Sequence, residues 1–317
     1  MDVRLPHPGQ PHAVLTATWE RSPLAIDPAQ LMALYTRHGA LLLRGFGADL
    51  DSFAGFTQQF CTGSVFNESP DRHLLDAAHN IQTVNGGTAP FPLHPELSRE
   101  PWKPDICFFA CLEPPRSLGA TTLCDGVDLV SQLPAAVRDG LAGRRLRYMQ
   151  PVNPAILEYW LGTPSPDAAL LAAPPPGCPY SFDWYDNQLV RVFTRPALHT
   201  PMFTAAPAFG NFLLFSFFHN RMRGYPSLDD GSAVPDAWLA EVKATGDRLS
   251  AAVQWQRGDL LMLDNSRFMH GRTAVVPDDV RLIASFFGYL KNAPRNPEEP
   301  ADAPWRRTEF RPPAPCR

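Results

Sequence analysis

The residues of this chain that most suggest chemistry are two histidines and one glutamate. His94 and Glu96 lie two residues apart in the stretch LHPELS, and His270 lies far downstream in LDNSRFMHGRTAV. In an extended segment, residues i and i+2 point to the same side, and proline favours extended backbone before it. Two imidazoles and one carboxylate would form the facial ligand set that leaves open positions on divalent iron for a co-substrate and O₂. The alternative is three ordinary polar residues, since an HxE pair is common by chance.

Two further residues strengthen the oxygenase interpretation. Arg281 follows His270 by 11 residues (281 − 270) and opens a predicted strand, and Thr121 follows Glu96 by 25 residues (121 − 96) on another. Arginine offers a planar, bidentate clamp for a carboxylate, and the threonine hydroxyl can add a second hydrogen bond. An iron with three protein ligands needs electrons to activate O₂. A chelating 2-oxo acid, anchored by its far carboxylate, can supply them.

Four other polar residues are candidates for contacts with a substrate. Gln82 and Asn85 lie on the predicted strand that leads to the LHPELS loop, His219 follows an apolar run, and Arg272 belongs to the triplet HGR. A structural hydrogen bond is the competing interpretation for each of them. For Arg272, that competing role is to brace the loop beside His270.

The elements that must position these residues are mostly strands. Apolar or alternating runs bounded by turn residues predict strands at 39–46, 80–86, 105–114, 120–126, 189–198, 211–218, 259–265 and 281–290. Caps and periodicity predict helices at 27–39, 51–61 (capped by Asp51 or Ser52), 127–143 (in two pieces around Pro134) and 235–255. We therefore predict a mainly β fold with flanking helices, of sandwich or jelly-roll type. We expect one domain over 1–317, with a core at 30–290 and a proline-rich tail at 294–317.

Composition narrows the class of protein. The chain has 317 residues, 44% of them hydrophobic, a formal net charge of −4 and a pI near 6.1. It can bury a large core, and nothing predicts a nucleic-acid partner. No apolar run is long enough for a membrane span and no secretory signal is visible, so we predict a cytoplasmic protein. The six cysteines form no CxxC pair, which favours reduced, buried thiols; zinc binding by Cys107 and Cys111 is the alternative.

Four motifs together resemble one protein family. These are GALLLRGF (39–46), PLHPELS (92–98), GATTLCD (119–125) and GDLLMLDNSRFMHGR (258–272). Their order and spacing resemble the taurine dioxygenase (TauD/TfdA) and clavaminate synthase-like family of Fe(II)/2-oxoglutarate-dependent oxygenases. The resemblance implies a double-stranded β-helix, a cupin-like jelly roll, that holds Fe(2+) through His94, Glu96 and His270. It also implies 2-oxoglutarate and O₂ as co-substrates, with 2-oxoglutarate held by Thr121 and Arg281.

Two positions refine what the resemblance implies. Family halogenases have a small residue where this chain has Glu96, so we do not expect halogenation. Sulfonate-oxidising members have a second arginine four residues beyond the one that binds 2-oxoglutarate. This chain has Ser285 there (281 + 4), so taurine is not the expected substrate.

The sequence leaves the substrate open. We expect an amino-acid-like or peptide-like small molecule whose unactivated C–H bond is hydroxylated, with desaturation or cyclisation as alternatives, in the biosynthesis of a specialised metabolite (natural product). The competing interpretations are a jelly-roll metal-binding protein without oxidative turnover, a hydrolytic zinc enzyme, and a taurine-type catabolic dioxygenase. Neither nucleic acid nor a membrane is an expected partner, and homo-oligomer formation is left open.

Overall fold

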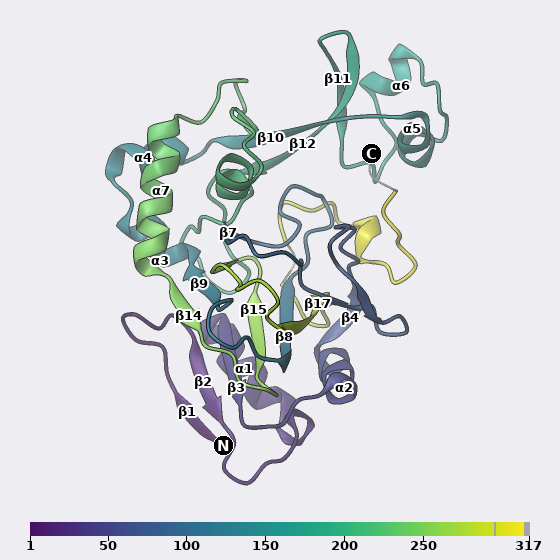
Figure 1. Cartoon of the computed structure of the whole chain (residues 1–317). Helices are drawn as coiled ribbons and strands as arrows, with labels where there is room; N and C mark the ends of the chain where they lie inside the picture. The colour runs from purple at the N-terminus through teal and green to yellow at the C-terminus, as the bar shows by residue number, and fades with distance from the viewer. Residues whose placement is uncertain (295, 314–317) are drawn as a thin grey trace.

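The centre of the molecule is a sheet of nine strands (Figure 1), seen in a computed structural model that describes residues 1–294 and 296–313. The strands are β1 (Asp2–Arg4), β2 (Ala13–Thr16), β3 (Ala40–Arg44), β4 (Cys61–Ser64), β5 (Leu74–Asp76), β6 (Ile81–Thr83), β8 (Ile106–Glu113), β15 (Leu260–Asp264) and β17 (Leu282–Leu290). Their order is β1-β2-β3-β15-β8-β17-β6-β5, and β4 also pairs with β17. The central strands are almost unbroken runs of buried residues, the pattern of strands covered on both faces.

A second sheet carries most of the residues that suggest chemistry. It consists of β7 (Phe91–His94), β9 (Thr121–Asp125), β14 (Ala251–Val253) and β16 (Phe268–Arg272), in the order β14-β9-β16-β7. Leu123 and Phe268 of this sheet share one buried cluster with Phe109 and Leu261 of the nine-stranded sheet. The two sheets therefore enclose a common core, which confirms the predicted jelly-roll class. Over the described residues, they are not hydrogen-bonded into a closed barrel.

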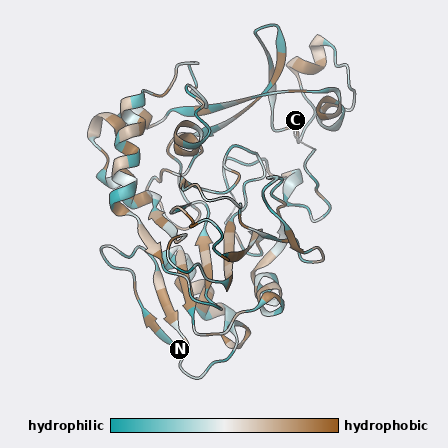
Figure 2. Cartoon of the chain, in the orientation of Figure 1, coloured by the Kyte–Doolittle hydropathy of each residue, from teal (hydrophilic) through white to brown (hydrophobic). Residues whose placement is uncertain are grey.

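Helices cover the outer faces of both sheets. The nine-stranded sheet is covered by α1 (Pro28–His38) and α2 (Leu50–Phe60), and the second sheet by α3 (Gly126–Gln132), α4 (Ala135–Leu141) and α7 (Asp236–Leu249). Leu31 and Phe53 pack with Leu41 on one side, and Leu129 and Val242 pack with Met269 on the other. The apolar strands accordingly lie inside the molecule, as the brown ribbons of Figure 2 show.

A third sheet extends the fold beyond the jelly roll, at the top of Figure 1. It consists of β10 (Arg145–Pro151), β11 (Ser181–Tyr185), β12 (Gln188–Pro196) and β13 (Ser227–Leu228), and it is accompanied by α5 (Pro154–Leu161) and α6 (Ala168–Ala172). Three short helical segments complete the described chain: η1 (Pro23–Ala25), η2 (Phe215–His219) and η3 (Pro304–Arg306). Trp305 of η3 is buried, so part of the proline-rich tail packs on the core.

The predicted strand at 211–218 is wrong, because this segment is helical and contains the π-helical turn η2. Asn211 starts the helical segment, since its side-chain oxygen accepts a hydrogen bond from the backbone N–H of Leu213. Phe212, Leu213 and Leu214 are all buried. A segment that is apolar on every side has no periodicity to distinguish a helix from a strand.

Two predicted helix boundaries also differ. Asp49, rather than Asp51 or Ser52, caps α2, in a reciprocal capping box with Ser52. The predicted helix at 235–255 ends at Leu249, and residues 251–253 form β14 against β9. The caps predicted at Asp27 and Gly39, and the break at Pro134, are confirmed.

Among the described residues, no helix combines the length and apolarity needed to cross a bilayer. The five described cysteines are free thiols, and Cys316 lies outside the described residues. Cys107 and Cys111 are fully buried on β8. Burial raises the pKa of the Cys111 thiol to about 12, which disfavours the thiolate that zinc requires.

Gly271 sits where three strands of the second sheet come closest. A Cβ atom at this position would lie 2.7 Å from the Phe91 carbonyl oxygen on β7 and 2.8 Å from Thr122 Oγ1 on β9. The pairing of β7 with β16 also shifts register here, between His270 and Arg272. Only glycine therefore allows this spacing of the strands that carry His94 and His270.

Gly271→Ala should lower the free energy of unfolding by about 1–3 kcal/mol, the typical cost of overpacking. Urea denaturation followed by circular dichroism measures the change. Gly63→Ala on β4 is the matched control, because a Cβ there meets nothing within 4 Å; it should be neutral or slightly stabilising. Equal behaviour of the two variants would contradict the close approach described at Gly271.

Candidate active site

Two neighbouring strands bring the predicted metal ligands together. His94 at the end of β7 is directly opposite His270 on β16, and their ring centroids are 4.7 Å apart. Glu96 follows β7 by two residues, and one ligand atom from each of the three lies within 4.8 Å of the others. Asn265 fixes the backbone of Glu96, since its Oδ1 accepts from Glu96 N (2.8 Å) and its Nδ2 donates to Glu96 O (3.1 Å).

The hydrogen bonding of His94 suits a metal ligand. His94 Nδ1 lies 2.8 Å from the Pro92 carbonyl oxygen, so Nδ1–H donates there and Nε2 keeps its lone pair for a metal. Burial and the nearby His270 lower the pKa of His94 to about 4, which keeps the imidazole neutral. His270 Nε2 lies 3.4 Å from Glu96 Oε1. Two imidazoles and one carboxylate are the donor set of a facial Fe(II) site, so these residues fit iron.

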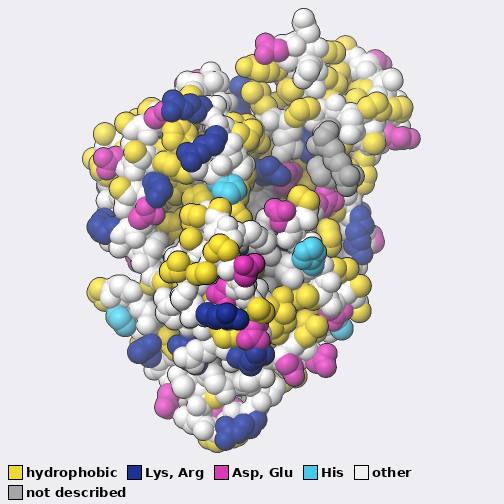
Figure 3. Space-filling view, viewed as in Figure 1, with side chains coloured by type: hydrophobic (Ala, Val, Ile, Leu, Met, Phe, Trp, Pro, Cys, Tyr) yellow, Lys and Arg dark blue, Asp and Glu magenta, His cyan; other side chains and the backbone are white. Residues whose placement is uncertain are grey.

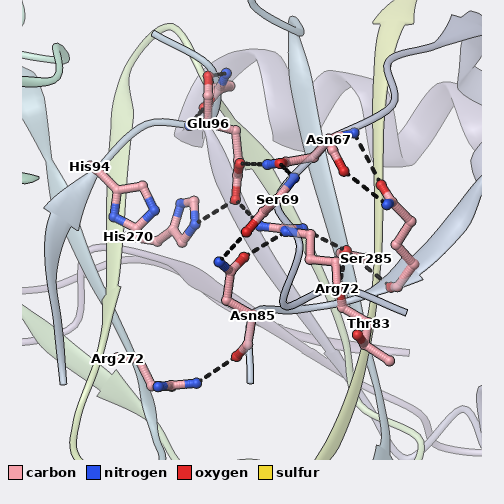
Figure 4. A network of polar contacts seen from close by, with 12 residues as sticks. Asn67, Ser69, Arg72, Thr83, Asn85, His94, Glu96, His270, Arg272 and Ser285 are labelled. Carbon is pink, nitrogen blue, oxygen red and sulfur yellow. Dashed lines mark hydrogen bonds and ion pairs between the residues drawn. The ribbon is translucent and has the colours of Figure 1, made fainter. Parts of the chain in front are cut away.

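The Glu96 carboxylate has two further partners that the sequence did not indicate (Figure 4). Arg72 Nη2 donates to Glu96 Oε1 at 2.9 Å, and Asn67 Nδ2 donates to Oε2 at 3.0 Å. The side chains of Arg72 and Glu96 are only 5% and 4% exposed. Burial alone would raise the pKa of Glu96, but Arg72 and His270 lower it well below its usual range. The carboxylate is therefore held ionised and fixed in orientation.

Arg72 also connects other residues around the site. Its Nε donates to Asn85 Oδ1 at 2.6 Å, and its Nη1 donates to Ser285 Oγ at 3.1 Å. Its guanidinium lies over the Phe287 ring, 5.0 Å from the centroid. Arg72 thus contacts Ser285, which stands at the position where sulfonate-oxidising members of the family have a second arginine. No pattern of spacing predicts this, since Arg72 lies in an irregular loop 24 residues from Glu96 in the chain.

Arg281 has free donors directed at the same cavity as the metal ligands. It lies immediately before β17, and its Nε donates to the Gly119 carbonyl oxygen at 2.8 Å. Gly119 has a φ of +90°, and a Cβ there would lie 3.1 Å from Arg281 Cδ, so glycine makes room for this contact. Among the described residues, Nη1 and Nη2 of Arg281 have no hydrogen-bond partner. Burial and Arg272 lower the pKa of Arg281 to about 10, so the group remains cationic at neutral pH.

Thr121 and Arg272 face each other across β9 and β16. Thr121 Oγ1 accepts a hydrogen bond from Trp255 Nε1 at 3.0 Å, which leaves the hydroxyl hydrogen to donate. Arg272 instead uses its guanidinium on the backbone: Nη1 donates to Asn85 O and Nη2 to Ala89 O, each at 2.7 Å. Arg272 therefore braces the loop that leads to β7, the competing role considered from the sequence.

A cavity of about 720 Å³ unites nearly all of the predicted residues. Its lining includes His94, Glu96, His270, Thr121, Arg281, Asn85, Arg272 and His219. His219 lies against Phe91 and Phe215, with ring centroids 4.8 and 4.6 Å away. Gln82 is not among the described lining residues. Both ends of its side-chain amide bond the Asn67 backbone, so its role is to hold the loop that carries Asn67.

A jelly roll with two histidines and a carboxylate beside an arginine-lined cavity defines the class of non-haem iron oxygenases. The model of the family described as "Taurine catabolism dioxygenase TauD, TfdA family" matches residues 8–285. The chain belongs to this family, and it is an Fe(II)/2-oxoglutarate-dependent dioxygenase whose co-substrates are 2-oxoglutarate and O₂. A search of curated proteins gave no match.

Solved structures share the fold at low sequence identity. PvcB, an Fe, α-ketoglutarate-dependent oxygenase from an isonitrile synthetic pathway, has a TM-score of 0.58 at 15% identity, covering 91% of this chain and 90% of PvcB. A taurine dioxygenase from Burkholderia xenovorans has a TM-score of 0.58 at 13% identity, covering 93% and 94%. AAD-2, in complex with Mn(II) and N-oxalylglycine, has a TM-score of 0.57 at 10% identity, covering 92% and 98%.

Arg72→Met should destabilise the metal-free protein by about 3–5 kcal/mol, because Glu96 would remain as an uncompensated buried charge. A divalent cation on Glu96 would supply the missing positive charge. Saturating Mn(II) should therefore restore much of the lost stability. Urea unfolding with EDTA and with Mn(II) measures both values.

Arg223→Met is the control for this substitution, because the Arg223 side chain is 80% exposed and its ion-pair partner Asp236 is 55% exposed. It should change stability by no more than about 0.5 kcal/mol in either condition. An identical loss for Arg72→Met with and without Mn(II) would contradict the charge-compensating role.

Proposed function

We propose that His94, Glu96 and His270 hold the Fe(II) of this dioxygenase and that Arg281 and Thr121 bind 2-oxoglutarate. The observation that carries the proposal is the meeting of three ligand atoms within 4.8 Å on the wall of the cavity that Arg281 and Thr121 also line. In this arrangement the unpartnered Nη atoms of Arg281 clamp the distal carboxylate of 2-oxoglutarate. The Thr121 hydroxyl donates a second hydrogen bond to it.

The residues around the metal ligands have separate tasks in this proposal. Bound Fe(II), with 2-oxoglutarate and O₂, supplies the oxidising power to attack an unactivated C–H bond. His94 stays neutral and presents Nε2, because Nδ1–H is held by Pro92 O. Arg72 and Asn67 hold the Glu96 carboxylate at both oxygens, and Asn265 holds its backbone. His94 and Glu96 are thus each oriented by a second group, as is usual for metal ligands.

We propose an amino-acid-like or peptide-like small molecule as the substrate, oxidised by hydroxylation, desaturation or cyclisation. The cavity volume of about 720 Å³ lies within the usual range for small-molecule sites. Its lining mixes aromatic side chains, such as Phe91, Trp102 and Phe215, with charged ones. The likeness to PvcB, which belongs to an isonitrile synthetic pathway, supports a role in specialised metabolism through fold alone.

Two features of the site argue against oxidation of a sulfonate and against halogenation, the two other outcomes considered from the sequence. Ser285 Oγ accepts a hydrogen bond from Arg72, but the same guanidinium is paired with Glu96. Position 285 therefore offers no free arginine of the kind that sulfonate-oxidising members have there, which disfavours taurine. Glu96 supplies the carboxylate ligand, so a halide has no vacated protein position on the metal.

His94→Ala, Glu96→Ala and His270→Ala should each abolish succinate formation from 2-oxoglutarate and sharply weaken Mn(II) binding. The reason is that each removes one of only three protein ligands. Mass spectrometry measures succinate, calorimetry measures Mn(II) binding, and circular dichroism checks that the variants fold. His73→Ala, an exposed histidine, is the matched control. Normal succinate formation by any triad variant would remove that residue from the ligand set.

Arg281→Ala should raise the apparent KM for 2-oxoglutarate at least about tenfold, because a charge-assisted hydrogen bond contributes about 1.5–3 kcal/mol. Arg281→Lys should recover only part of the loss, since lysine lacks the planar fork. Initial rates of succinate release at varied 2-oxoglutarate give these values, with the exposed Arg223, changed to Ala, as the control. An unchanged KM in both Arg281 variants would assign the co-substrate carboxylate to another residue.

A further inference from the structure

A second pair of buried charges, Glu100 and Arg191, lines the same cavity as the metal ligands. Glu100 lies one turn beyond Glu96, with its N–H donating to the Leu97 carbonyl oxygen. Arg191 projects from β12 of the third sheet. The two residues are 7% and 5% exposed, so each is removed from bulk water. Figure 3 shows the molecule hollowed near the middle of this face, with basic and acidic side chains at the hollow.

Gln150 separates the two charges. Its Oε1 accepts from Arg191 Nη2 at 2.5 Å, and its Nε2 donates to Glu100 Oε1 at 3.2 Å. Arg99 Nε approaches the same Glu100 Oε1 at 3.3 Å. Glu100 and Arg191 therefore do not neutralise each other directly, and Tyr180 supports the Arg191 guanidinium from 4.7 Å.

Both charged groups keep unsatisfied hydrogen-bonding atoms. No described residue accepts from Arg191 Nε or Nη1, and none donates to Glu100 Oε2, although all three atoms are buried. A buried charged group without its hydrogen bonds is costly, so such atoms call for a partner that the protein itself does not provide. The missing partners are an anion for Arg191 and a hydrogen-bond donor for Glu100 Oε2, since Arg99 is ion-paired with Oε1 only.

The other charges of the cavity support this assignment. Arg72 is paired with Glu96, Arg272 is bound to backbone carbonyls, and Arg281 serves 2-oxoglutarate in the proposed function. Arg99 also lines the cavity, but it is 45% exposed and ion-paired with Glu100. Arg191 is therefore the buried arginine left for an anion on the substrate. On the acidic side, Glu68 also lines the cavity, and burial together with Glu100 raises the pKa of Glu68. Two mutually repelling carboxylates favour a cation between them.

We propose that Glu100 and Arg191 bind the two ends of a zwitterion, and that the substrate is a free α-amino acid. Its carboxylate would pair with Arg191 and its ammonium group with Glu100 Oε2, leaving the side chain to extend toward the metal ligands. This inference rests on the proposed function for the reaction, but the binding site is testable apart from it. An aminoacyl group carried as a thioester or an amide has no carboxylate, so it would leave Arg191 unpaired.

The test compares free amino acids with analogues that lack one charge. Full-length protein with Mn(II) and 2-oxoglutarate would be titrated calorimetrically with a panel of proteinogenic amino acids, then with the amide and the N-acetyl derivative of each binder, and with taurine. The free amino acid should bind at least about tenfold more tightly than either derivative. Failure of every amino acid to bind, or equal binding of a blocked derivative, would overturn the proposal.

Charge-removing variants assign the two ends. Arg191→Gln should weaken binding of the free amino acid at least about tenfold and bring the ratio of its affinity to that of the amide near one. Glu100→Gln should likewise bring the ratio of its affinity to that of the N-acetyl derivative near one. Arg147, on the face of β10 opposite to Gln150, and Glu113 on β8 lie outside the described cavity lining. As controls, Arg147→Gln and Glu113→Gln should change neither ratio. An equal loss of affinity for the free amino acid and both derivatives would show that Arg191 and Glu100 have a merely structural role, and it would overturn the proposal.

Succinate release by the Fe(II) enzyme separates this inference from the proposed function. If amino acids bind with the expected charge dependence but the wild type forms no succinate, the proposed metal and 2-oxoglutarate residues are wrong and the zwitterion site stands. If 2-oxoglutarate is converted to succinate but the affinity ratios do not depend on Arg191 and Glu100, the zwitterion site is wrong.

Discussion

The structure depends most on how it keeps one carboxylate, Glu96, ionised inside the protein. A buried anion is tolerated only with a close positive charge and full hydrogen bonding. Arg72 supplies the charge, Asn67 the second side-chain hydrogen bond, and Asn265 the backbone contacts. Arg72 and Asn67 come from the loop at 66–72, and Asn265 comes from the turn between β15 and β16. These two segments and the turn after β7 are therefore held together at a single residue, Glu96.

The same requirement explains residues that contact no metal ligand. Gln82 uses its whole side-chain amide on the Asn67 backbone, and Asn85 accepts from Arg72 Nε. Arg272 in turn fixes the carbonyl of Asn85. The polar network of Figure 4 thus runs continuously from Glu96 to the loop before β7. Hydrogen bonds in a buried network strengthen one another, which accounts for the number of side chains committed to one carboxylate.

The sequence predicted those residues of the site that short spacings and motifs connect. His94 ends β7 and Glu96 lies in the turn two residues later, where their ligand atoms meet. The run from 258 to 272 places His270 on a strand beside them. Thr121 was found in the motif GATTLCD, and Arg281 was found by its position 11 residues after His270. Arg72 could not be found this way, since its pairing with Glu96 joins an irregular loop to a strand end. Hydrogen bonds across loops leave no periodicity in sequence.

The fold, like the site, was predictable from the sequence only in part. Strands β3, β8, β15 and β17 were recognised because buried strands are short apolar runs with turn residues at both ends. Residues 211–218 have the same composition and are helical, because Asn211 caps them and a buried helix is apolar on all sides. The third sheet was largely missed, since only β12 has a strong strand pattern, and it is this sheet that contributes Arg191 to the cavity.

The distribution of arginines in the cavity has a consequence for how two anions can share it. Arg72 is neutralised by Glu96, so it attracts neither ligand strongly. Arg281 and Arg191 each keep free donors, but one precedes β17 in the nine-stranded sheet and the other lies on β12 in the third sheet. A 2-oxo acid and an amino acid both carry carboxylates and would compete for a single arginine. In the proposed assignment, two separate guanidinium groups from different sheets would allow both to bind at once, with their positions fixed by the scaffold rather than by each other.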